Sequence, residues 1–295
     1  MLRVPSAALL CVCFLASCGT SKKPVVVGSK NETEEMLLGE IVAQHLEHRL
    51  GHPVERRTGL GGTAVLYQSI LSGEVGIYPE YTGTGLINIL QQSPKSEAQT
   101  VYKIVSEAYK KNWNLVWLKP SEANDSQGLV TTRKIAEKYN LYTVSKLATL
   151  APQLRLAAVP EFEEREDGLK GLKKAYGGFN FKSVQLYDYG VKYRVILKGE
   201  ADVTVGFTTD GDLSNNDLVL LKDDKNFWPP YNVAPVIRGQ LLESDPNIAK
   251  VLDKVSAKLN NTVLQGLNAE VDIKKREYTE VAKEFLQKEG LIVSK

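Results

Sequence analysis

The chain has 295 residues, 43% of them hydrophobic, and its 37 basic residues nearly balance its 35 acidic ones. Charges of both signs are scattered along the chain, which argues against nucleic acid and against a polybasic membrane patch as partners. The length is sufficient for two ordinary domains or one large one. Beyond the N-terminal region no segment approaches the roughly 18 uninterrupted apolar residues of a membrane span.

All three cysteines lie within the first 18 residues, after Arg3 and an apolar run at 7–16, and the stretch at 15–18 is Leu-Ala-Ser-Cys. This layout is typical of a bacterial secretory signal, and its end resembles a lipobox. We expect residues 1–18 to be a lipoprotein signal ending at the lipidated Cys18, with residues 19–23 as a tether. An ordinary signal peptide with an incidental cysteine is the alternative. Either way the mature chain has no cysteine pair for a disulfide and no thiolate nucleophile.

From residue 24 the chain alternates short β-branched runs with helical stretches. Asn31, with Glu34 three residues later, predicts the start of the first helix. Strand, helix, strand and helix at this spacing indicate a parallel sheet covered on both faces. We expect strands at 24–28, 54–57 and 75–78, helices at 36–46 and 64–71, and a glycine turn at 59–63.

A second α/β series follows without a low-complexity linker. Two such series indicate two lobes with a cleft between them, and from residue 245 the chain is mostly amphipathic helix. The expected strands are 115–118, 129–132, 154–159, 183–186 and 202–207. The expected helices are 134–139, 169–176, 189–198, 248–259, 263–267 and 277–289.

Ligands of open α/β sheets bind outside the carboxyl ends of the strands. That rule selects the segments 29–30, 78–84, 124–127, 161–165 and 207–210 as the walls of a cleft. In the second of these, residues 78–85 are Tyr-Pro-Glu-Tyr-Thr-Gly-Thr-Gly. Free N–H groups and a threonine hydroxyl at a helix start would suit an anion, although a plain glycine-rich turn explains the same pattern.

Six segments together resemble the substrate-binding proteins of osmoprotectant ABC importers, of the glycine betaine/choline/carnitine type. The similarity covers essentially the whole mature chain, and its most specific part is the block at 78–85. The segments, in order, are 27–34, 59–63, 77–85, 161–168, 208–210 and 223–231.

The resemblance implies an α/β, two-lobed periplasmic-binding-protein fold (type II-like) with a ligand cleft between the lobes. Residues 24–123 plus 230–295 would form lobe one, and residues 124–229 would form lobe two. The function implied is that of an extracytoplasmic subunit that captures a quaternary-ammonium osmoprotectant such as glycine betaine. Its partner would be a membrane permease with a cytoplasmic ATPase. We expect a monomer without cofactor or metal, held in the cell envelope, or in the periplasm of a host with an outer membrane, by its N-terminal lipid alone.

The resemblance also implies roles for single residues. A quaternary ammonium has no N–H to donate and is held by aromatic faces, each worth roughly 0.5–2 kcal/mol. Tyr81 and Tyr231 would be two walls of such a cage, and Asp125 a polar residue of the cleft. The ligand carboxylate would be engaged by three side chains, those of Lys30, Thr84 and Arg165.

Two further cage positions, commonly tyrosine in the family, are Gln127 and Phe207 here. Phenylalanine keeps an aromatic face, whereas glutamine offers none. Gln127 is either a lost wall, which would weaken betaine binding, or a partner for a ligand with a hydrogen-bonding group. The second interpretation leaves open a binding protein of the same fold for another small zwitterion or an amino-acid-like ligand.

Other functions find less support in the residues. His45, His48 and His52 share a helical spacing but have no evident carboxylate or thiol partner, so a solvated polar face is expected and not a metal site. No serine stands in a nucleophile elbow, and the glutamates at 161–166 form a charge run that selects no catalytic pair. An enzyme is therefore not expected. A purely structural envelope lipoprotein would not need the residues gathered at the strand ends.

Overall fold

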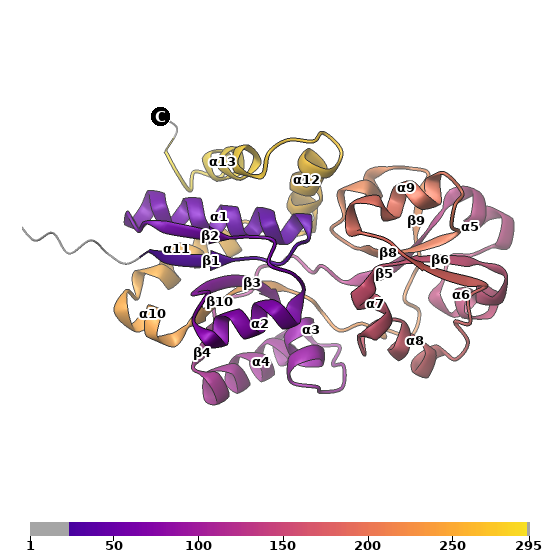
Figure 1. The fold of residues 1–295 in the computed structure, drawn as a ribbon, viewed down its shortest axis with the longest axis horizontal. Helices are drawn as coiled ribbons and strands as arrows, with labels where there is room; N and C mark the ends of the chain where they lie inside the picture. Colours follow the sequence, from indigo (N-terminus) through magenta and orange to yellow (C-terminus); the bar gives the residue numbers. More distant parts are fainter. Residues whose placement is uncertain (1–23, 294–295) are drawn as a thin grey trace, which may run out of the picture.

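The computed structural model describes residues 24–293, which form two lobes, each built on a five-stranded sheet (Figure 1). The signal and tether expected at 1–18 and 19–23 lie outside the described residues. The first sheet has the order β2-β1-β3-β10-β4 and contains β1 (Val25–Gly28), β2 (Val54–Arg57), β3 (Ile77–Tyr81), β4 (Leu115–Trp117) and β10 (Val233–Arg238). The second has the order β7-β6-β8-β5-β9 and contains β5 (Gln127–Thr132), β6 (Arg155–Ala158), β7 (Ser183–Leu186), β8 (Val203–Phe207) and β9 (Leu218–Leu220).

Helices cover both sheets and complete both lobes (Figure 1). Those before β5 are α1 (Thr33–Leu50), α2 (Thr63–Ser72), α3 (Thr82–Thr84), the π-helix η1 (Gly85–Ile89) and α4 (Ala98–Trp113). Those between β5 and β10 are α5 (Arg133–Tyr139), α6 (Val144–Leu150), α7 (Pro160–Glu164), α8 (Leu169–Tyr176) and α9 (Lys192–Leu197), with 3-10 turns η2 (Ala151–Gln153), η3 (Tyr189–Val191) and η4 (Gly211–Ser214). The C-terminal helices are α10 (Gly239–Ser244), α11 (Asn247–Ser256), α12 (Asn261–Asp272) and α13 (Tyr278–Lys288).

The first sheet is apolar on both faces. Ile77 of β3 and Ile237 of β10 pack in the core shared with α1 and α11. Their strand neighbours Tyr78 and Val236 pack in the opposite core, against α2 and α4. Because side chains alternate across a strand, this arrangement requires apolar residues at consecutive positions. It accounts for the uninterrupted hydrophobic runs of these strands.

Both sheets are mixed, which corrects the expectation of a parallel sheet. Strand β1 is parallel to β2 and β3, as the sequence predicts, but β10 is antiparallel to β3 and β4. In the second sheet β5 is antiparallel to β8 and β9. Strands β5 and β10 are the first that the chain forms after each crossing between the two sheets. They enter their sheets from the side of the other lobe, so they run against their neighbours.

The two crossings lie side by side and are tied to α12. Asn124 and Asn232 form an isolated antiparallel bridge. The Asn124 side-chain oxygen accepts from the Tyr231 N–H at 2.7 Å, and the Asn261 side-chain oxygen accepts from the Asn124 N–H at 2.8 Å. Helix α12 stands at the junction of the lobes in Figure 1. It approaches lobe two so closely that a Cβ on Gly211 would lie 2.5 Å from the backbone nitrogen of Ala269.

Two local expectations at the first helix are wrong. Helix α1 begins at Thr33, and Glu32 occupies its N-cap without a side-chain hydrogen bond, so Asn31 is not the cap. The histidines do not form a solvated face: His45 is fully buried, and burial lowers its pKa to about 4, while His52 pairs with Asp245 at 2.9 Å. The apolar stripe of α1 is wider than the helical spacing suggested because α11 and α13 both pack on it.

Within residues 24–293, no helix combines the length and the apolar character needed to cross a membrane, and no group of histidine, cysteine and acidic residues is arranged to hold a metal ion.

Candidate functional site

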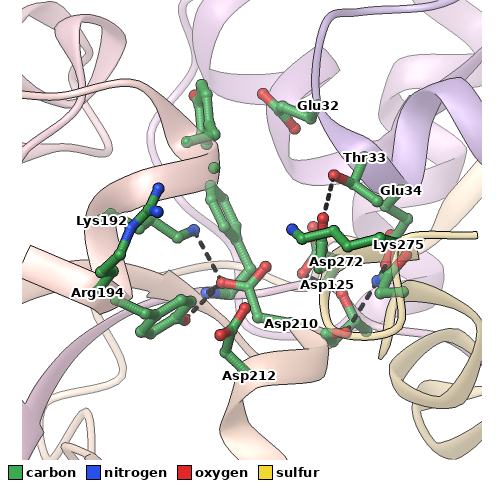
Figure 2. A pocket seen from close by; sticks show the side chains of 16 residues that line it. Glu32, Thr33, Glu34, Asp125, Lys192, Arg194, Asp210, Asp212, Asp272 and Lys275 are labelled. Carbon is green, nitrogen blue, oxygen red and sulfur yellow. Dashed lines mark hydrogen bonds and ion pairs between the residues drawn. The ribbon is translucent and has the colours of Figure 1, made fainter. Parts of the chain in front are cut away.

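A cavity of about 260 Å³ lies between the lobes, beside the start of α1 and the start of α9 (Figure 2). Acidic side chains outnumber basic ones in its wall, and three aromatic rings line it as well. An excess of carboxylates raises the local concentration of cations. The acidic residues are Glu32, Glu34, Asp125, Asp210, Asp212 and Asp272; the basic ones are Lys192, Arg194 and Lys275; the rings are those of Tyr189, Tyr193 and Phe207.

Glu34, in the first turn of α1, is joined to lobe two through Asn268 of α12. Its carboxylate accepts from the Tyr81 hydroxyl at 2.7 Å and from the Asn268 amide at 2.7 Å. The same amide of Asn268 donates to the backbone carbonyl of Thr209 in lobe two, at 2.9 Å. Burial raises the pKa of Glu34, against the lowering effect of these hydrogen bonds. A cation in the cavity would therefore stabilise its ionised form.

Asp125 lies on the wall of the first cavity. The Thr209 hydroxyl donates to its carboxylate at 2.6 Å, and the residue is 7% exposed. Burial, together with the charge of Glu34, raises the pKa of Asp125 well above its usual range. Two buried carboxyl groups thus disfavour each other's ionisation at this end of the cavity.

The ammonium of Lys30 binds carboxylates of its own lobe and does not line the first cavity. Its ammonium donates to Glu80 at 2.6 Å and to Glu35 at 3.2 Å, and it lies 4.8 Å from the centre of the Tyr81 ring. Only 2% of the residue is exposed. Burial lowers the pKa of Lys30, but the surrounding carboxylates outweigh it, so the pKa lies above its usual value. Lys30 therefore remains charged and fixes the end of β3 on which Tyr81 stands.

Three of the expected residues meet around Asp167. Arg165 donates to both oxygens of Asp167, at 2.7 and 2.6 Å, and makes a longer bond of 3.4 Å to the Thr84 hydroxyl. The Tyr231 hydroxyl donates to Asp167 at 2.5 Å. Burial raises the pKa of Asp167, but Arg165 outweighs this effect and holds the pKa below its usual range. The bidentate pair orients the guanidinium at the contact between the lobes.

Arg165 lines a second cavity of about 1250 Å³, which also contacts α2 and η1 of lobe one. Glu161 shares this wall, and the Tyr189 hydroxyl donates to it at 2.9 Å. Because Tyr189 lines the first cavity, the Tyr189–Glu161 hydrogen bond marks the boundary between the two cavities. The first cavity thus adjoins the one that Arg165 lines.

Gln127 and Phe207 are paired residues of β5 and β8. Phe207 lines the first cavity. Gln127 is buried, and its amide nitrogen makes no hydrogen bond of good geometry within the part of the chain that the structure describes, although its side chain opposes the rise that burial causes in the pKa of the neighbouring Tyr231 hydroxyl. A buried donor without a partner costs about 1–3 kcal/mol. This position therefore holds an unused donor next to the proposed aromatic walls.

The expected residues fall into groups. Asp125 and Phe207 line the first cavity, with Gln127 paired to Phe207; Lys30 and Tyr81 contact each other; Thr84, Arg165 and Tyr231 meet at Asp167.

The sequence interpretation missed most residues of the first cavity, including four that bear on its chemistry. Tyr189, Lys192 and Tyr193 were assigned only to a helix, and Glu34 only to the start of one. For Tyr189 a signal existed: it comes directly after β7, so the strand-end rule, applied to that strand, would have selected it.

Comparison with known proteins relates this geometry to a family. Residues 23–288 match the family described as the substrate-binding domain of the ABC-type glycine betaine transport system. The ergothioneine transport permease/ergothioneine binding protein EgtU of Helicobacter pylori is 35% identical over 92% of this chain. The present chain spans only 48% of the length of that relative. The glycine betaine-binding protein YehZ of Escherichia coli is 35% identical over 90% of this chain and 91% of its own.

A solved structure described as a glycine betaine/carnitine/choline ABC transporter shares the fold. It is 29% identical, with a TM-score of 0.74, over 90% of this chain and 99% of that one. The match confirms the expected two-lobed α/β fold of periplasmic binding proteins.

The Lys30 cluster generates a prediction about pH. Burial raises the pKa of Glu35 from about 4.5 to about 8, helped by the charge of Glu80 and opposed by Lys30. Between these values the folded protein keeps a proton that the unfolded chain releases, so this group's contribution to stability is complete below about pH 4.5 and is lost as the pH rises through 8. In Glu35→Gln this dependence should disappear. Urea denaturation from pH 5 to 8 should show that the wild type loses at least about 1.4 kcal/mol relative to the variant, the value of one pKa unit.

The exposed Glu74→Gln serves as the matched control and should follow the wild type at every pH. Parallel pH profiles of stability for the wild type and Glu35→Gln would contradict the assignment of the retained proton to Glu35.

Proposed function

Because the chain belongs to the family of substrate-binding domains of ABC-type glycine betaine transport systems, we propose that it captures a small quaternary-ammonium zwitterion, such as glycine betaine, and delivers it to an ABC permease. Members of this family are transport proteins and not enzymes. The observation that carries the proposal is the wall of the first cavity, where carboxylates and three aromatic rings converge.

That wall suits the cationic end of such a ligand. A trimethylammonium group donates no conventional hydrogen bond, so aromatic faces and nearby carboxylates are the groups that hold it once water is excluded. Tyr81, Phe207 and Tyr231 are our proposed aromatic walls, with Asp125 as an acidic neighbour; of these rings only that of Phe207 lines the first cavity in the structure. Tyr189 and Tyr193 add two further rings beside Phe207.

The carboxylate end is assigned to the adjoining arginine. Arg165 and the Thr84 hydroxyl are already in contact, and both can donate to an anion. Arg165 bonds Asp167 through two nitrogens, which leaves it oriented and partly engaged. In place of the direct contact expected for Lys30, we propose that this lysine holds Tyr81 in position through Glu80.

Closure of the lobes follows from these assignments. We propose lobe one at 24–123 plus 230–295 and lobe two at 124–229, with the ligand between them. Thr84 belongs to the first and Arg165 to the second. A ligand that contacts both must favour the closed arrangement over an open one.

A second ligand is favoured by Gln127. Its buried, unpartnered amide donor would be satisfied by an acceptor on the ligand, which glycine betaine does not offer among its methyl groups. One relative at 35% identity is named as an ergothioneine binding protein. Ergothioneine is also a trimethylammonium zwitterion but carries a polar ring, so it combines both requirements.

The place of action is extracytoplasmic, as for substrate-binding proteins of ABC importers generally. We propose that Cys18 carries the lipid that holds the protein at the membrane and that the protein acts as a monomer. The permease, with its ATPase on the cytoplasmic side, would receive the ligand.

The first prediction tests the carboxylate end. Arg165→Ala should weaken glycine betaine binding by about 1.5–3 kcal/mol, because a charged hydrogen-bonding partner is lost. Choline, which has no carboxylate, should be affected much less. Calorimetric titration of both ligands measures the difference, with the exposed Arg133→Ala as control. Equal losses for the two ligands would remove Arg165 from the site.

The second prediction decides between the two interpretations of Gln127. Gln127→Tyr should strengthen glycine betaine binding by about 0.5–2 kcal/mol if the glutamine is a lost wall. If it is a specificity residue, the same change should instead weaken ergothioneine by about 1–3 kcal/mol and leave glycine betaine weak. Titration of both ligands, with Gln153→Tyr as an exposed control, distinguishes these cases. A variant that binds every ligand as the wild type does would place Gln127 outside the site.

The third prediction concerns the anchor. Mass spectrometry of the native protein should find a diacylated or triacylated Cys18 as the first residue. Cys18→Ala should release the protein from the membrane or stop its processing while ligand affinity stays unchanged, because the residue precedes both proposed lobes. An unmodified N-terminus in the soluble fraction would refute the anchor.

A further inference from the structure

One cation of the chain itself already lies in an aromatic box. The ammonium of Lys192, the first residue of α9, lies 4.6 Å from the centre of the Phe207 ring, 5.0 Å from that of Tyr193 and 5.4 Å from that of Tyr189. Only 4% of its side chain is exposed. We call this group of three rings the Lys192 box.

Asp210 contacts Lys192 and two residues of the Lys192 box, Tyr193 and Phe207. Its carboxylate pairs with the Lys192 ammonium at 2.8 Å and accepts from the Tyr193 hydroxyl at 2.5 Å. It also accepts from the backbone N–H of Phe207 at 2.9 Å. Figure 2 shows Lys192 and Asp210 joined in this way at one wall of the cavity. Aromatic faces with a carboxylate behind them are the arrangement by which proteins recognise an organic cation.

The position of Lys192 has a consequence for ligands. Phe207 serves both the Lys192 box and the proposed ligand cage, so a ligand ammonium on this ring would lie close to the lysine charge. Like charges at such a separation repel each other strongly when both are shielded from water. A zwitterion offsets the repulsion because its carboxylate is attracted by the same lysine. A ligand with a net positive charge lacks this attraction, so the lysine charge weakens the pull of the cavity's carboxylates on it.

We propose that Lys192 is a specificity-determining residue that occupies the Lys192 box and so disfavours net cations relative to zwitterions. The inference rests on the proposed function, because it takes the first cavity as the ligand site. It assigns to this lysine a role that neither the resemblance nor the strand-end rule suggested.

The test uses Lys192→Met, which keeps the length and apolar stem of the side chain but removes its charge. The probe is the tetramethylammonium ion, which carries the charge and no carboxylate. In calorimetric titrations the variant should bind this ion at least tenfold more tightly than the wild type does. The matched control is Lys198→Met, which removes a charge from an exposed residue at the C-terminal end of the same helix and should leave both affinities unchanged.

Two further variants guard against misinterpretation. Lys192→Met leaves the partly buried Asp210 without its cation, which destabilises a folded protein. The double variant Lys192→Met/Asp210→Asn removes both charges and should still bind tetramethylammonium more tightly than the wild type, although less tightly than the single variant. Adding Phe207→Ala to Lys192→Met should abolish the gain, because the ring that the ion would use is lost.

Glycine betaine, titrated in parallel, separates the two proposals. If the wild type binds glycine betaine but Lys192→Met and the double variant bind tetramethylammonium no better than it does, the role of Lys192 is refuted and the proposed function stands. If Lys192→Met loses glycine betaine altogether, the lysine is a partner of the ligand carboxylate and not an excluding group, which also refutes the proposal. If the wild type binds neither glycine betaine nor ergothioneine while Lys192→Met binds tetramethylammonium more tightly, the proposed function fails and the role of Lys192 stands.

Discussion

Hydrogen bonds between buried polar and charged groups cross from one lobe to the other, and these contacts organise the cleft. Arg165 reaches across to Thr84, and Asn268 joins Glu34 of lobe one to the Thr209 carbonyl of lobe two. An unpaired buried charge costs several kcal/mol, so separating the lobes must expose these groups to water or replace their partners. A ligand with one charge of each sign is suited to such an interface, because it supplies partners to both sides.

The chain also supplies ammonium groups to its own aromatic rings. Lys30 lies over Tyr81 and Lys192 over Phe207, and each lysine is neutralised by carboxylates of its own lobe. Two of the three rings proposed for the ligand, those of Tyr81 and Phe207, therefore already have a cation on one side. In the cavity wall Asp210 is the counter-charge of Lys192, and the remaining carboxylates favour a further cation.

The strand-end rule depends only on the order of strands and helices, so it can be applied to the sequence alone. Of the residues in the segments that it selects, Asp125 and Phe207 line the first cavity and Arg165 lines the second. Strand β10 was not predicted from the sequence. Pro235 interrupts its pattern, and the structure tolerates it by placing it opposite Pro79 of β3, so that both residues without an N–H fall at the same point of the ladder.

The partners that each side chain contacts could not be predicted from the sequence. The resemblance assigned Lys30 to the ligand carboxylate, whereas the fold places Glu35 and Glu80 around its ammonium, a contact between residues 50 positions apart in the case of Glu80. Tyr189 and Lys192 fall at the start of a helical pattern, and only the packing of α9 against β8 shows that they face Phe207. Charges whose partners come from distant segments are the part of the site that periodicity does not describe.

A crystal structure of the protein with bound glycine betaine tests the central claim most directly, because it locates both ends of the zwitterion. The account predicts the trimethylammonium group against the rings of Tyr81, Phe207 and Tyr231, with the carboxylate at Arg165 and Thr84 and the two lobes closed on it. A ligand bound outside the space between the lobes, or one turned with its carboxylate toward those rings, would contradict it.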